Sequence, residues 1–183
     1  VEITRRLGLP NVRLELNSIG DSACRPAYVE RLKGFLADHA AELDDDARAK
    51  AATSPLRVFD TKNPHVAQVL AAAPTIGDSL CAECAAHFAE VRALLDAMGV
   101  AYTVVPTLVR GLDYYTRTVW EFVNDDLEAA QSTVCAGGRY DGLLQELGGQ
   151  PTPGVGWAAG VERLALSLGE VESGARTDVF VVV

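Results

Sequence analysis

Short connections between the strand-like segments of the C-terminal half constrain the possible folds of this chain more than any other feature. Residues 100–104 alternate apolar and polar positions, and residues 116–123 are rich in β-branched and aromatic side chains. Further strands are expected at 132–136 and, with a buried composition, at 154–159. With an earlier strand at 12–16, the order is strand, helical block, then closely connected strands. This order predicts an α+β fold with a mostly antiparallel sheet and flanking helices.

Helical patterns fill most of the interval after the first strand. Apolar residues at i, i+4, i+7 and i+8 predict one helix face made of Tyr28, Leu32, Phe35 and Leu36. Pro64 suits the first position of a short helix that continues to Leu70. Before Gly99, a plausible C-terminal cap, a longer helix is predicted from the spacing of Phe88, Val91, Leu95 and Met98.

The composition is that of a globular protein, with 49% hydrophobic and 22% charged residues in a chain of 183. No apolar run reaches the roughly 18 residues that a membrane span requires, and no signal peptide opens the chain. We therefore expect a soluble, cytosolic protein with no membrane partner. The net charge of −9 excludes a general basic surface for nucleic acid, so any RNA contact would be local.

Among the four cysteines, only Cys81 and Cys84 have the spacing of metal ligands. A structural zinc site usually needs four ligands, and no second cysteine pair is present. His87 is the one nearby candidate ligand, and we expect it to be a surface or packing residue. The pair is therefore interpreted as ordinary thiols at a helix start, and no zinc or other bound metal is expected. Nothing indicates a disulfide framework.

Residues 108–118 place arginines and an aspartate beside a tyrosine pair, Tyr114 and Tyr115. The planar fork of an arginine such as Arg110 suits phosphate, because it gives directed, charge-assisted hydrogen bonds. Tyrosines offer an apolar wall with a polar tip, which suits a small aromatic or amide ligand. A structural salt bridge beside core tyrosines is the alternative, and spacing alone favours it.

Two glycine-rich segments follow. In residues 135–142, Gly137 and Gly138 allow a ligand to approach the backbone closely or form a tight turn, and the turn is the simpler interpretation. In residues 154–164, a strand leads into a helix with Arg163 in its first turn, where a cation opposes the helix dipole and suggests an anionic ligand. A dinucleotide-binding loop is rejected there, because no acidic residue ends a second strand about 20 residues later.

Taken together, these three segments resemble the histidyl-tRNA synthetases. Residues 108–119 are similar to the first histidine-binding signature of that family, and residues 136–143 to the second. Residues 154–164 resemble motif 3 of the class II synthetases. The helical block is similar to the insertion domain of the family, most clearly at residues 55–62.

The resemblance implies a class II synthetase-type sheet and a histidine–tRNA ligase that uses ATP with Mg²⁺. It assigns Arg110 to the α-phosphate of ATP as the catalytic residue, and Arg163 to the adenine and the γ-phosphate. The histidine site would be formed by Tyr114, Tyr115, Tyr140 and the backbone of Gly137 and Gly138. The implied partners are histidine, ATP and tRNA(His), with a homodimer as the intact enzyme.

The resemblance also divides the chain into four parts. Residues 1–21 would belong to the catalytic domain, residues 22–80 to a helical insertion domain, and residues 81–169 to the C-terminal half of the catalytic domain. Residues 170–183 would be a linker and the first strand of an anticodon-binding domain. Motifs 1 and 2 are not found in this sequence, so we expect that residues 1–183 alone do not aminoacylate.

Two alternatives stay open. The first is a non-catalytic relative, the regulatory subunit of the first enzyme of histidine biosynthesis, which shares the catalytic fold and binds histidine. The inserted helical block and the joint presence of Arg110 and Arg163 argue against it. The second is a purely structural or interaction fragment.

Overall fold

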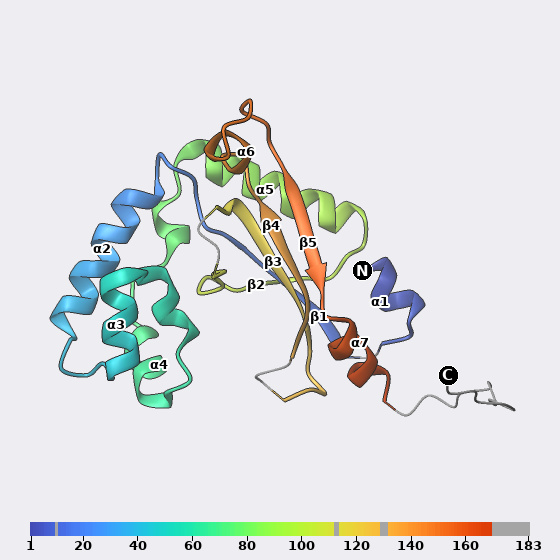
Figure 1. Ribbon diagram of the computed structural model, residues 1–183, viewed down its shortest axis with the longest axis horizontal. Helices are drawn as coiled ribbons and strands as arrows, with labels where there is room; N and C mark the ends of the chain where they lie inside the picture. Colours follow the sequence, from blue (N-terminus) through green and yellow to red (C-terminus); the bar gives the residue numbers. More distant parts are fainter. Residues whose placement is uncertain (10, 112–113, 129–131, 170–183) are drawn as a thin grey trace, which may run out of the picture.

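A computed structural model describes residues 1–9, 11–111, 114–128 and 132–169 of the chain. It contains a five-stranded sheet with a group of short helices at one side (Figure 1). The predicted linker and strand at 170–183 lie outside the described residues. No helix in the described ranges combines the length and the apolar character needed to cross a lipid bilayer.

The sheet has the strand order β2-β1-β3-β4-β5. Its strands are β1 (Val12–Ser18), β2 (Thr103–Val104), β3 (Thr116–Asn124), β4 (Thr133–Arg139) and β5 (Val155–Ala159). Only β1 and β2 are parallel, and the other three neighbouring pairs are antiparallel. The predicted α+β fold with a mostly antiparallel sheet is therefore confirmed.

One face of this sheet is covered by α5 (Ala82–Ala97), which contacts β3. His87, Val91 and Leu95 of this helix line a cavity of about 420 Å³ together with side chains of β1 and β3 that include Leu14 and Trp120. The chain also forms α1 (Glu2–Arg6), α6 (Leu143–Glu146) and α7 (Val161–Leu168), the last of which contacts β4. The opposite face of the sheet carries the candidate site described below.

The helical group contains α2 (Arg25–Asp38), α3 (Asp45–Thr53) and α4 (Pro64–Leu70), with 3-10 turns η1 (Pro55–Asp60) and η2 (Ile76–Ser79). Its core is a separate apolar cluster of buried residues: Tyr28, Leu32, Leu36, Leu43, Ala47, Val58, Val66, Leu70, Ala73 and Ile76. Local caps fix the helix starts, since the Asp44 carboxylate accepts from the Ala47 N–H at 2.8 Å and the Asn63 side chain accepts from the His65 N–H at 3.0 Å.

Two local predictions are wrong. The chain does not turn at Gly137 and Gly138, because β4 runs through both residues to Arg139. Strand β5 is not buried, since it is the last strand of the described sheet and Trp157 is 57% exposed. In each case a tertiary neighbour, or its lack among the described residues, overrides the local pattern. The predicted longer helix before Gly99 is present as α5, which ends at Ala97 with Met98 as its C-cap.

Candidate functional site

The floor of the site is a face of the sheet with small side chains. Ala136 of β4 pairs with Glu121 of β3 on one side and with Ala158 of β5 on the other. Two residues along β4, Gly138 pairs with Val119 in the same way. Successive side chains of a strand point to opposite faces, so these residues lie on one face. The small residues leave room above the sheet for a ligand.

Arg110 reaches this face from the loop before β3. Its guanidinium forms an ion pair with Glu121, and the Thr133 hydroxyl donates to the other Glu121 carboxylate oxygen at 2.7 Å. The Asn17 side-chain amide fixes the loop that carries Arg110 by donating to the carbonyls of Pro106 at 3.1 Å and Leu108 at 2.9 Å. Arg110 Nε is buried without a hydrogen-bond partner among the described residues. The salt bridge considered from the sequence is therefore present, and it leaves the buried Nε donor without a partner among the described residues.

Arg163 lies in the first turn of α7, as the sequence predicted. Its guanidinium donates to the Thr133 carbonyl at 2.7 Å, so the same β4 residue contacts Glu121 through its side chain and Arg163 through its backbone. Arg110 and Arg163 line one cavity of about 300 Å³, whose other walls are residues 133–136 and 158–160. The structure thus brings the two arginines to one cavity, where they can bind an anion together.

Three tyrosines form an aromatic cluster further along the same face. The ring centroids of Tyr114 and Tyr115 are 4.8 Å apart, those of Tyr114 and Tyr140 are 5.7 Å apart, and those of Tyr115 and Tyr140 are 6.3 Å apart. Burial, with a hydrogen bond to Tyr114, raises the pKa of the Tyr115 hydroxyl, which therefore stays protonated at neutral pH. The predicted wall of tyrosines is thus assembled from two separate segments of the chain.

The two adjacent glycines face different sides of the sheet. A Cβ on Gly138 would lie 2.5 Å from Cδ1 of Tyr115, so the ring rests directly on this glycine. A Cβ on Gly137 would instead meet Trp120 Cζ2 at 2.7 Å, on the other face. Gly138 therefore belongs with the tyrosines, and the side-chain position of Gly137 does not face them. Gly156, which the sequence did not single out, gives Tyr140 similar room, since a Cβ there would lie 2.5 Å from the hydroxyl oxygen.

A wider cavity of about 710 Å³ opens beside the tyrosines, between the sheet and α2. Tyr114, Tyr115 and Arg117 line it from the sheet side, and Arg25 from the helical side. Arg25 connects the two parts, because its guanidinium donates to the carbonyl of Tyr115 at 2.6 Å and to that of Ile19 at 3.0 Å.

Sequence reasoning missed Glu121 and Arg25. Glu121 had a visible signal, because it is a charged residue inside a strand whose neighbours Trp120 and Phe122 are apolar. Arg25 had none, since it begins a helix at an ordinary position and its partners lie 6 and 90 residues away in sequence.

The prediction that Cys81 and Cys84 lack further ligands is wrong. Cys24 and Asp21 approach them from the turn after β1, and the four ligand atoms all lie within 4.8 Å of one another. The chain fold supplies what the sequence spacing lacked, because the two segments are far apart in sequence. His87, the other candidate ligand, is instead 2.9 Å from the guanidinium of Arg139.

Comparison with known proteins gives one consistent family. The model of the family described as histidyl-tRNA synthetase matches residues 5–164. The histidine–tRNA ligase of Halorhodospira halophila is 56% identical over 164 residues, which is 90% of this chain and 38% of that protein. The histidine–tRNA ligase of Rhodococcus erythropolis is 52% identical over 182 residues, covering 97% of this chain and 42% of that protein.

A solved structure shows the same likeness in three dimensions. The apo histidyl-tRNA synthetase of S. aureus superposes with a TM-score of 0.69 at 38% sequence identity. The match covers 97% of this chain and 42% of that one. The chain therefore spans about 40% of the length of the relatives that it matches.

Proposed function

The chain belongs to the histidyl-tRNA synthetase family, and on that premise we propose that the intact protein is a histidine–tRNA ligase. It activates histidine with ATP and transfers the histidyl group to tRNA(His). The observation that carries this proposal is the cavity lined by both Arg110 and Arg163 beside the tyrosine cluster. Cations and an aromatic wall on one sheet face suit a reaction between a nucleotide and a small amino acid.

In the first step, a carboxylate oxygen of histidine forms a bond to the α-phosphorus of ATP. The bond between that phosphorus and the bridging oxygen breaks, and pyrophosphate leaves with the electron pair. Two anions must approach each other, so a fixed cation at the developing charge lowers the barrier. We assign this role to Arg110, whose orientation is held by Glu121 and whose Nε has no partner among the described residues.

Arg163 is assigned to the adenine and the γ-phosphate of ATP. The cavity carries two guanidinium groups, and the carboxylate that pairs with Arg110, that of Glu121, also accepts a hydrogen bond from Thr133. This donor set fits an anion rather than a free metal ion. Mg²⁺ is therefore proposed to arrive with ATP as part of the substrate, where it neutralises charge on the phosphates.

Histidine is proposed to bind against Tyr114, Tyr115 and Tyr140. Three packed rings form a wall for the imidazole, and the protonated Tyr115 hydroxyl can hydrogen-bond to it. Gly138 contributes by letting Tyr115 rest on the strand. Gly137 is retained as a backbone contact only, because its side-chain position faces Trp120.

In the second step, the terminal ribose hydroxyl of tRNA(His) attacks the histidyl carbonyl, and AMP leaves. Because the net charge of −9 excludes a general basic surface, any contact of this part of the protein with the RNA would be local. The homodimer, the cytoplasmic location and the domain boundaries at residues 22, 81 and 170 remain proposals based on the family resemblance.

The direct test is aminoacylation by the intact protein, with labelled histidine, ATP and a tRNA(His) transcript. The proposal predicts charging with histidine and none with a tRNA of another specificity. If the folded protein binds histidine but charges no tRNA, the regulatory relative of the histidine-biosynthesis enzyme becomes the better description, and the proposed function is rejected.

A further inference from the structure

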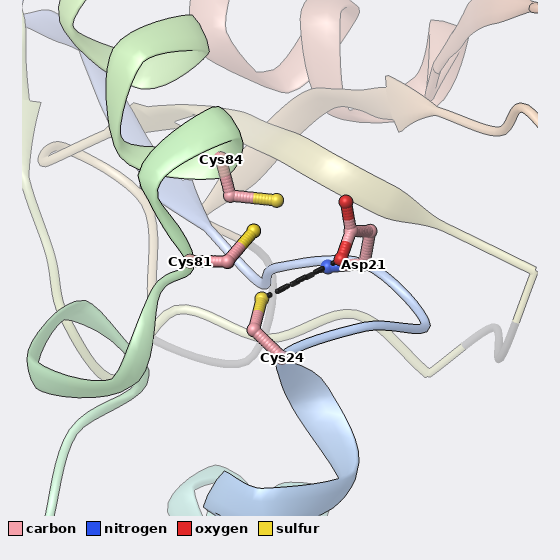
Figure 2. A group of neighbouring side chains, drawn as sticks. All are labelled: Asp21, Cys24, Cys81 and Cys84. Atoms are coloured by element: carbon pink, nitrogen blue, oxygen red, sulfur yellow. Dashed lines mark hydrogen bonds between the residues drawn. The ribbon is translucent and has the colours of Figure 1, made fainter.

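Four potential metal ligands meet where the helical group joins the sheet. Asp21 and Cys24 lie in the turn between β1 and α2, and Cys81 and Cys84 lie at the start of α5. Figure 2 shows the three sulfur atoms and the carboxylate pointing toward one another. All four ligand atoms are within 4.8 Å of each other, and Cys24 and Cys84 are 5% and 0% exposed.

The turn that carries the first two ligands is shaped around the Cys24 sulfur. Gly20 has a φ of +64°, and a Cβ there would lie 2.7 Å from that sulfur, so glycine is required on both counts. The Ala23 N–H donates to Asp21 at 3.0 Å, and the Asp21 N–H approaches the Cys24 sulfur at 3.5 Å. These contacts aim both side chains at the start of α5.

The start of α5 fixes the position of the Cys81 side chain. The backbone N–H of Cys84 donates to the Cys81 sulfur. Arg117 lies 3.6 Å from the Asp21 carboxylate and offsets part of the negative charge of the group.

We propose that Asp21, Cys24, Cys81 and Cys84 bind one Zn²⁺ as a closed tetrahedral site. Three sulfurs and one carboxylate suit a borderline-soft ion, and a set of four protein ligands leaves no open position for a substrate. With Zn–S bonds of about 2.3 Å, sulfurs in a tetrahedral site lie roughly 3.8 Å apart. The side chains therefore need to close by no more than about 1 Å. On binding, the thiol protons pass to solvent.

The site joins the two ends of the helical group. The chain enters α2 directly after Cys24 and returns to the sheet domain at Cys81. One ion would therefore bind the two places where the chain passes between the sheet and the helical group. Arg117 links the same carboxylate to β3, close to the tyrosine cluster. The zinc would fix the position of the helical group against the wall of the 710 Å³ cavity, whose lining includes Asp21. Its role is structural, because neither Arg110 nor Arg163 is in the ligand group.

The test measures the metal content of the intact protein, purified with a reductant and dialysed against a weak chelator. Elemental analysis and native mass spectrometry are expected to find about one zinc per chain. Replacement by Co²⁺ should give sulfur-to-cobalt charge transfer and the intense visible bands of a tetrahedral site. Zinc at trace level in the wild type, or a Cys81–Cys84 disulfide in its place, would overturn the proposal.

The matched pair of variants is Cys84→Ser and Cys135→Ser, since Cys135 is the one cysteine outside the group. Cys84→Ser is expected to lose the stoichiometric zinc, and Cys135→Ser to retain it. If Cys84→Ser does not fold, Asp21→Asn serves instead, with an expected zinc affinity at least about 10-fold weaker and an altered cobalt spectrum. Equal zinc content and affinity in all variants would contradict the assignment.

Discussion

Glu121 is the residue through which the sheet orients the arginine of the proposed reaction. It lies in the middle of β3, pairs with Arg110 and accepts a hydrogen bond from Thr133. Its cross-strand neighbours are Glu15 on β1 and Ala136 on β4, and Ala136 is too small to shield the ion pair from a ligand on that side. In the proposed reaction, Glu121 would therefore act on the substrate through Arg110, as a positioning residue.

Replacing Glu121 with glutamine keeps the shape of the side chain and removes the charge that orients Arg110. We expect kcat for histidine-dependent pyrophosphate exchange to fall by about 10- to 100-fold, with a smaller change in the KM for histidine. Steady-state exchange kinetics measure both constants. A larger effect on the KM for histidine than on kcat would show that Glu121 contacts the amino acid instead.

Two glycine-to-alanine changes test the support of the tyrosine wall. In Gly138→Ala the new methyl group would lie 2.5 Å from the Tyr115 ring, so we expect a displaced ring and a KM for histidine raised at least about 10-fold. Gly34→Ala is the control, because a Cβ there meets nothing within 4 Å. In the middle of α2 it should stabilise the fold by about 0.5–1 kcal/mol. Equal KM values in both variants would contradict the packing argument.

The sequence predicted individual residues where the chemistry was unusual for its surroundings. Arg110 was identified as a cation in strand-like surroundings and Arg163 as a cation in the first turn of a helix, and the structure brings them to one cavity. The interpretation of Gly137 and Gly138 as a turn was wrong. Both lie within β4, where the lack of a side chain makes room for Trp120 and Tyr115. Cys24 could not be linked to Cys81, since only the fold brings their segments together.

At the scale of elements, the helical group depends on its own apolar cluster. Leu32 of α2 is 0% exposed within that cluster, whereas Leu94 of α5 is 57% exposed. We expect Leu32→Ala to lower the free energy of unfolding of the helical group by about 2–5 kcal/mol. Leu94→Ala should change stability by less than about 0.5 kcal/mol.

Hydrogen exchange resolves this loss by element. In Leu32→Ala, amides of α2, α3 and α4 should exchange faster, while those of β3 and β4 keep their protection. Uniform loss of protection across both parts would show that the helical group and the sheet unfold as one unit.

The contact between α5 and β4 is sensitive to pH through His87. Burial, with the nearby Arg139 guanidinium, lowers the pKa of the imidazole, and its Nδ1 is buried without a partner among the described residues. The unfolded chain therefore binds a proton at a higher pH than the folded one. Stability should fall as the pH drops below about 6.5.

Urea unfolding between pH 7 and pH 5 measures this effect. His87→Gln should reduce the loss of stability on acidification, because the group that the unfolded state protonates is removed. His65→Gln makes the same exchange at an exposed position of α4 and leaves the contact of His87 with Arg139 intact. An unchanged slope in His87→Gln would contradict the role given to His87.

Elements with local signals were predicted well. The helix from Pro64 to Leu70 has its bounds as predicted, because a proline and an asparagine cap define its start. The strand expected at 100–104 is reduced to Thr103–Val104, since pairing with β1 rather than alternation sets its length. The ends of a strand depend on which neighbouring strand it pairs with, and a local sequence pattern does not specify that strand.

At the scale of the whole molecule, the two faces of the sheet differ in what they carry. Its one face packs against α5, and the other carries the arginine cavity and the tyrosine cluster. The helical group joins this second face through Arg25 and through the proposed zinc site. The chain spans about 40% of the length of its relatives, so the proposed reaction is assigned to the intact protein.

In the proposed reaction, Arg110 acts on ATP while histidine is activated at this face of the sheet. The measurement is histidine-dependent exchange of pyrophosphate into ATP by the intact protein, with Arg110→Ala beside the wild type. Arg5→Ala is the control, since Arg5 is an exposed residue of α1. We expect exchange by the wild type and by Arg5→Ala, and a loss of about 100- to 1,000-fold in Arg110→Ala. Wild-type exchange in Arg110→Ala, or no exchange by a folded protein that binds histidine, would contradict this proposal.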